Sequence, residues 1–127
     1  MILVDTSVWV GHFRLTDRHL VRLLVGELVT THPFVVGELA CGRMRNRAEM
    51  LSLLEALPGS TVAYDDEVLL FIERHALMGA GIGYVDVHLL AATALSLSCR
   101  IWTHDRRLKA AAALLDLEYI APDLSDQ

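Results

Sequence analysis

Short runs of branched apolar residues alternate with helix-like segments along the whole chain, and this alternation constrains the fold more than any other feature. The runs predict short strands at residues 2–5, 28–30, 61–64, 101–103 and 119–121. Strands that are separated by helices favour a parallel sheet covered on both faces. We therefore predict an α/β fold with a central parallel β-sheet of about five short strands, flanked by helices on both faces.

The segments between these runs carry the apolar spacing and the stop signals of helices. One of them, 85–97, is apolar nearly all round, which indicates a helix packed inside the protein. A chain of 127 residues can build one core and is too short for two, so we expect a single domain over residues 1–127. The predicted helices are 6–14, 17–26, 31–41 (capped by Thr31), 46–56, 65–78, 85–97 and 106–115.

Composition limits the classes of protein that the chain can belong to. Hydrophobic residues make up 54% of the chain, but no apolar run is long enough to cross a membrane and the N-terminus lacks signal-peptide features, so we expect no membrane association. Cys41 and Cys99 belong to no paired motif and predict buried free thiols, which fits a reducing cytoplasm. The net charge of −5 does not favour nucleic-acid binding by the surface as a whole.

Basic residues are nevertheless clustered, and ten of the eleven are arginines. Arginine favours planar, two-pronged contact with phosphate or carboxylate groups. Solvated helix faces are the alternative explanation of each cluster. The clusters are Arg14, Arg18 and Arg22; Arg43, Arg45 and Arg47; and Arg106, Arg107 and Lys109.

Four carboxylates stand where a purely structural role does not fully explain them. Asp5 and Asp105 each follow a predicted strand and precede a helix, so either could be only a helix cap. Glu38 and Asp86 fall on predicted apolar helix faces. Burial of an unpaired carboxylate there would cost at least several kcal/mol of folding free energy. A salt bridge to an arginine would be the structural explanation for Glu38, and a cap the one for Asp86.

If these four acids converge, they cannot all be ionised unless a cation is present. Their ligand atoms would all be hard oxygens, which suit Mg²⁺ or Mn²⁺ and not zinc. A carboxylate cluster of this kind supports metal-assisted hydrolysis of phosphodiesters.

Four segments together resemble the PIN-domain family, and within it the VapC-type toxin ribonucleases of bacterial toxin–antitoxin pairs. They are VDTSVW at the start, GELACG around Glu38, GYVDVHLLAATAL around Asp86 and WTHDRRL around Asp105. The resemblance spans essentially the whole chain, and the segments follow the family's order. It implies a metal-dependent endoribonuclease that cuts single-stranded or looped RNA and leaves a 5′-phosphate and a 3′-hydroxyl.

The resemblance also assigns roles to residues and implies partners. The acidic quartet would be Asp5, Glu38, Asp86 and Asp105. Three of these acids (Asp5, Asp86 and Asp105) would hold the metal, and Glu38 would complete the cluster or position the water. The family further implies a homodimer and a small VapB-like antitoxin that blocks the cleft. Small polar residues that accompany the acids in the family, and would hydrogen bond to them or to phosphate, are Thr6, Ser7 and Thr103.

Two other functions stay open from the sequence. The first is a catalytically inactive PIN-fold binding module, in which the acids only cap helices. The second is a phosphotransfer or phosphatase domain that uses Asp5 as nucleophile. The haloacid-dehalogenase-like pattern of such enzymes needs a second aspartate two residues later, where this chain has Ser7. The sequence does not identify the RNA that would be cut.

Overall fold

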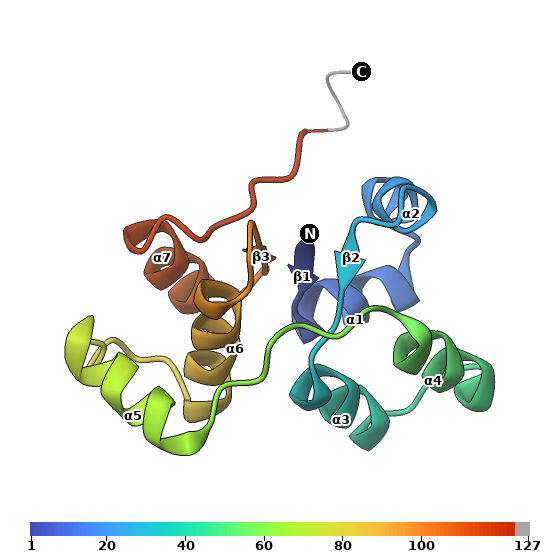
Figure 1. The fold of residues 1–127 in the computed structure, drawn as a ribbon. Helices are drawn as coiled ribbons and strands as arrows, with labels where there is room; N and C mark the ends of the chain where they lie inside the picture. Colours follow the sequence, from blue (N-terminus) through green and yellow to red (C-terminus); the bar gives the residue numbers. More distant parts are fainter. Residues whose placement is uncertain (124–127) are drawn as a thin grey trace.

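A parallel sheet of three strands lies at the centre of the computed structural model, which describes residues 1–123 (Figure 1). The strands are β1 (Ile2–Val4), β2 (Val29–Thr30) and β3 (Arg100–Trp102), in the order β2-β1-β3. Both neighbours run parallel to β1, as the alternation of strands and helices predicts. The end of the predicted domain, 124–127, lies outside the described residues.

The predicted number of five strands is wrong for the described residues, because the segments 61–64 and 119–121 do not form strands. Only part of each segment packs on the core: Ala63 is buried, whereas Val62 and Ile120 are exposed at 47% and 74%. Single parallel bridges nevertheless extend both edges of the sheet. Thr31 pairs with Gly59 beyond β2, and Ile101 pairs with Glu118 beyond β3.

Helices cover the sheet from two sides, which confirms the predicted fold class. Figure 1 shows the helices α1 to α4 on one side of the strands and the helices α5 to α7 on the other. Their bounds agree closely with the predicted ones, except that α5 ends four residues early. They are α1 (Thr6–Arg14), α2 (Arg18–Val25), α3 (Pro33–Cys41), α4 (Arg47–Ala56), α5 (Asp65–Arg74), α6 (Tyr84–Leu95) and α7 (Arg106–Leu114).

The strand β1 is buried at the middle of the sheet and determines where the carboxylates lie. Leu3 and Val4 have no exposed surface. Val4 is in register with Trp102 of β3, and the Asp5 N–H donates to the Trp102 carbonyl at 2.9 Å. The residues that follow β1 and β3 therefore meet at the same carboxyl edge, where active sites of parallel sheets usually lie. Within residues 1–123, every helix is too short or too polar to cross a membrane.

Candidate active site

Asp5 lies at the end of β1, where two hydroxyl groups hold its side chain. Asp5 Oδ2 accepts hydrogen bonds from Ser7 Oγ at 2.8 Å and from Thr103 Oγ1 at 2.7 Å. These hydroxyl oxygens in turn accept backbone N–H groups, from His104 at 2.9 Å and from Asp105 at 3.0 Å. The chain beyond β1 is thus tied to the chain beyond β3 through one carboxylate oxygen. Neither hydroxyl occupies the other oxygen, Oδ1.

The two aspartates at the strand ends differ in whether their side chains cap the helix that follows. Asp5 occupies the N-cap position of α1, yet its side chain makes no capping bond within the described residues, so the cap interpretation is wrong for Asp5. Asp105 does cap α7, because Asp105 Oδ1 accepts the Leu108 N–H at 2.9 Å. Since that bond uses one oxygen, the exposed Asp105 carboxylate retains a second oxygen for other contacts.

Glu38 is tied to α1 and faces solvent. Thr6 Oγ1 donates to Glu38 Oε1 at 2.9 Å, which links α1 to α3. The prediction that Glu38 lies on a buried stripe is wrong, because Glu38 is exposed, as are Phe34 and Cys41 on its predicted face. Several apolar side chains of α3 stay on the surface, so the helical pattern overstates burial there. For the same reason the expected burial of both thiols holds for Cys99 alone.

The pKa of Asp86, which lies in the first turn of α6, shows the influence of the other three acids. The pKa of the half-buried Asp86 carboxyl is raised from 3.8 to about 6, first by burial and then by the negative charges of Asp5, Asp105 and Glu38, in that order. The Gly83 N–H opposes this shift by stabilising the charged form. The structure therefore brings Asp5, Asp105 and Glu38 within electrostatic range of Asp86.

The donor set fits a hard divalent cation. It consists of four carboxylates, whose mutual repulsion a cation would relieve, and oxygen donors suit Mg²⁺ or Mn²⁺. As they stand, no three His, Cys, Asp or Glu side chains among residues 1–123 are grouped closely enough to hold a metal ion. Glu38 and Asp105 are both exposed, and each has one carboxylate oxygen in a hydrogen bond, to Thr6 and to the Leu108 N–H respectively.

Carboxylates gathered at the carboxyl edge of a parallel sheet agree with the comparison against protein families, in which a model described as the PIN domain matches residues 2–114. The chain belongs to the PIN-domain family. It is also similar to two proteins named Ribonuclease VapC32, from Mycobacterium tuberculosis strains CDC 1551 / Oshkosh and ATCC 25618 / H37Rv. Each is 48% identical over 113 residues, which cover 89% of this chain and 91% of the relative. The resemblance inferred from the four motifs is thereby confirmed.

One arginine near the acids of this PIN domain makes a contact that the sequence does not indicate. Arg107 of α7 packs across the loop before α6, and Arg107 Nη1 donates to the Gly81 carbonyl at 3.3 Å. Gly81 has φ +78°, and a Cβ there would lie only 2.7 Å from Arg107 Nη1. The guanidinium thus holds the backbone that leads to Asp86. The glycine run GAGIG predicts a flexible connection, but nothing in it indicates this partner.

A buried histidine is a second feature that the sequence does not indicate. His32, and not the predicted Thr31, is the N-cap of α3, and His32 Nδ1 accepts the Phe34 N–H at 3.0 Å. Burial, reinforced by the nearby His88, lowers the pKa of His32 from 6.5 to about 4. The folded protein therefore keeps His32 neutral over a range of pH in which the unfolded chain protonates it.

This difference predicts that His32 makes the PIN domain less stable as the pH falls from 6.5 towards 4, and has no such effect above that window. The slope is at most about 1.4 kcal/mol per pH unit for one group. We expect His32→Asn, which keeps a good N-cap but cannot titrate, to lose less stability than the unsubstituted protein over this window. Urea unfolding at several pH values measures the difference, and parallel curves for the two proteins would contradict it.

Proposed function

We propose that this PIN domain is a divalent-metal-dependent endoribonuclease that hydrolyses RNA phosphodiester bonds and serves as the toxin of a toxin–antitoxin pair. The observation that supports the proposal is the electrostatic effect of Asp5, Asp105 and Glu38 on Asp86 near the carboxyl edge of the sheet. The 48% identity to proteins named ribonucleases supports RNA as the substrate.

The residues divide into those that would hold a cation and those that would act around it. Asp5, Asp86 and Asp105 would hold Mg²⁺ or Mn²⁺, which supplies activation of water and neutralisation of phosphate charge when it is bound. Glu38 would position the attacking water, because Thr6 holds its Oε1 and leaves Oε2 for another contact. Ser7 and Thr103 orient the Asp5 carboxylate through its Oδ2.

The test of this function is cleavage of RNA by the purified protein with and without metal. We expect added Mg²⁺ or Mn²⁺ to support cleavage, and a chelator to abolish it. The products should carry a 5′-phosphate and a 3′-hydroxyl. The same assay decides the alternatives: an inactive binding module leaves RNA intact under every metal, and a phosphatase releases phosphate without cutting the chain.

Thr103 provides a sharper test of how the acids are held. Thr103→Val removes the hydroxyl that links Asp5 to the Asp105 N–H, so cleavage should fall by roughly 10–100-fold, as it does when hydrogen-bond partners of metal ligands are lost. Thr103→Ser keeps the hydroxyl and should retain most activity.

Thr93→Val is the matched control, because Thr93 is equally buried but bonds to the Leu89 carbonyl inside α6. It should affect stability alone. Equal activity of the Thr103→Val and Thr93→Val proteins would contradict the assigned role of Thr103.

The partners follow from the proposed toxin role. The first is a second copy of the chain in a homodimer, for which exposed leucines of α5 and α6 such as Leu69, Leu70 and Leu95 offer apolar surface. The second is a small VapB-like antitoxin that acts with the toxin in the cytoplasm. Coexpression with the product of a small adjacent reading frame should suppress cleavage. Light scattering measures the oligomeric state.

A further inference from the structure

A groove of about 790 Å³ begins at Glu38 and runs between α1, α3 and the start of α4. Its volume falls in the range of specific ligand pockets. Glu38 is one of the four acids of the proposed active site, so an occupant of the groove lies beside that site. The groove therefore extends the proposed active site in one defined direction.

Three arginines line this groove: Arg14 from the end of α1, and Arg43 and Arg45 from the loop between α3 and α4. All three are exposed, and none makes an ion pair or a side-chain hydrogen bond within residues 1–123. Three unpaired guanidinium groups lining one groove favour an anionic occupant. This concentration of positive charge stands out in a chain whose net charge is −5.

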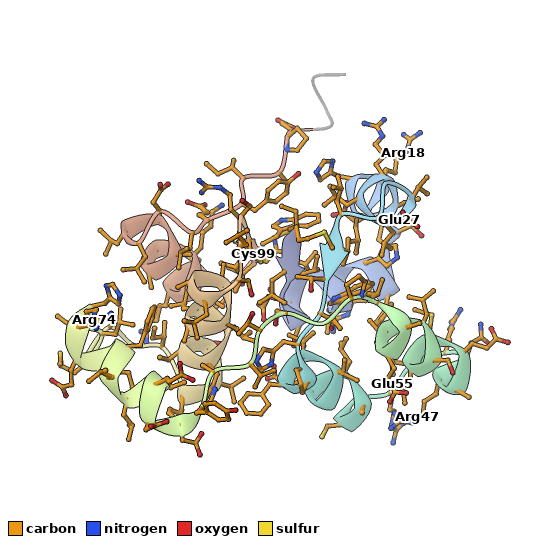
Figure 2. All side chains as sticks on the ribbon, in the orientation of Figure 1. Arg18, Glu27, Arg47, Glu55, Arg74 and Cys99 are labelled. Atoms are coloured by element: carbon orange, nitrogen blue, oxygen red, sulfur yellow. The ribbon has the colours of Figure 1, made fainter. Side chains whose placement is uncertain are left out.

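A fourth arginine of the same region, Arg47, holds the backbone beside the groove and is therefore not available to an anion. Arg47 donates from Nη1 to the Gly42 carbonyl at 3.0 Å and from Nη2 to the Ala40 carbonyl. It thereby folds the loop back onto the end of α3, and Figure 2 shows it at the corner between α3 and α4. Arg47, at the start of α4, is thus engaged with backbone, whereas Arg43 and Arg45 of the loop stay available.

Apolar and aromatic side chains complete the groove. Phe13, Met44 and Met50 are half-buried along it, and Leu39 is buried beneath them. Phe13 also belongs to an aromatic group, with ring centroids 6.0 Å from Trp9 and 6.1 Å from His12. In proteins that bind single-stranded nucleic acid, cationic side chains contact the phosphates and neighbouring aromatic or apolar side chains contact the bases.

We propose that this groove binds the backbone of the RNA substrate as a single strand, with Arg14, Arg43 and Arg45 contacting successive phosphates on one side of the cleaved bond. The inference rests on the proposed ribonuclease function and identifies which of the chain's arginine clusters carries RNA. It predicts that the substrate must be unpaired where it leaves the acidic cluster along α1 and α3.

The test measures binding separately from cleavage. Binding of a short, fluorescently labelled single-stranded RNA is followed by anisotropy in the Asp5→Asn background, which prevents turnover. Adding Arg14→Gln, Arg43→Gln and Arg45→Gln should weaken binding by about tenfold or more at low salt. The slope of log affinity against log salt concentration should become shallower by about 2, because each of the three lost phosphate contacts contributes about 0.7 to the slope on a single strand.

Arg74→Gln is the matched control, because Arg74 is an exposed arginine of α5 that Figure 2 places on the opposite side of the molecule from Arg47. It should leave the affinity and the salt dependence unchanged. Melting curves of each variant confirm that the fold is retained, as expected for exposed side chains.

The outcomes separate this inference from the proposed function. Unchanged RNA affinity in the triple variant overturns the groove inference and indicates that a protein segment occupies the groove instead. An absence of RNA binding by the Asp5→Asn protein overturns the groove inference in the same way. If the intact protein cuts no RNA under any metal while binding still depends on the three arginines, the ribonuclease proposal fails and the groove inference stands.

Discussion

Replacing Asp5 with asparagine is expected to lower the rate of RNA cleavage by more than about a hundredfold, while the fold persists. The loss should exceed the roughly 10–100-fold effect of removing a partner of a metal ligand, because Asp5 itself would hold the cation. The fold persists because the amide oxygen of asparagine can still accept the Ser7 and Thr103 hydroxyls. Initial cleavage rates and thermal melting of the purified proteins measure the two effects.

Asp116→Asn is the matched control for this substitution. Asp116 is exposed, lies away from the acids in a 3.5 Å ion pair with Arg100, and has φ +56°, a conformation that asparagine tolerates. It should leave cleavage unchanged. An Asp5→Asn protein that cuts RNA at a rate close to that of the Asp116→Asn protein would sink the assignment of Asp5 to the metal.

The largest expected effect on stability comes from truncating Leu90 to alanine in the helix that carries Asp86. Leu90 has no exposed surface, so Leu90→Ala removes buried methyl groups and leaves a cavity between α6 and its neighbours. We expect a loss of about 2–5 kcal/mol in the free energy of unfolding. For a chain of this length, that corresponds to a Tm lower by roughly 7–20 °C.

Leu97→Ala provides the comparison, because Leu97 lies just beyond α6 and is 95% exposed. The same change there should alter stability by no more than about 0.5 kcal/mol. Urea unfolding of both variants gives the free energies. Similar values for the two leucines would mean that α6 does not contribute to the core as its burial indicates.

The sequence predicts the strand-end part of the candidate site well. The apolar runs before Asp5 and Asp105 are short and end abruptly, so the positions of these acids at the edge of a parallel sheet follow from simple patterns. The helix that presents Asp86 is apolar nearly all round, and its residues from Val87 to Thr93 are indeed buried.

Other features depend on packing that no local pattern contains. Glu38 shares its helix with apolar residues that the fold leaves exposed, so its environment could not be read from periodicity. The sequence shows Arg43, Arg45 and Arg47 as one cluster, yet only Arg47 bonds to backbone. That division depends on how the loop folds back onto α3.

The central position of β1 also has a consequence for when the protein can become active. Asp5 bonds to Thr103, 98 residues later in the chain, so the acidic cluster is assembled by contacts of very high sequence separation. Closing such a long loop is entropically costly and slow compared with forming local helices. During synthesis, Asp5 leaves the ribosome 98 residues before its partner Thr103. A nascent chain that has not reached Thr103 therefore lacks this contact, and a truncated product that stops before Thr103 is expected to lack the proposed RNA cleavage.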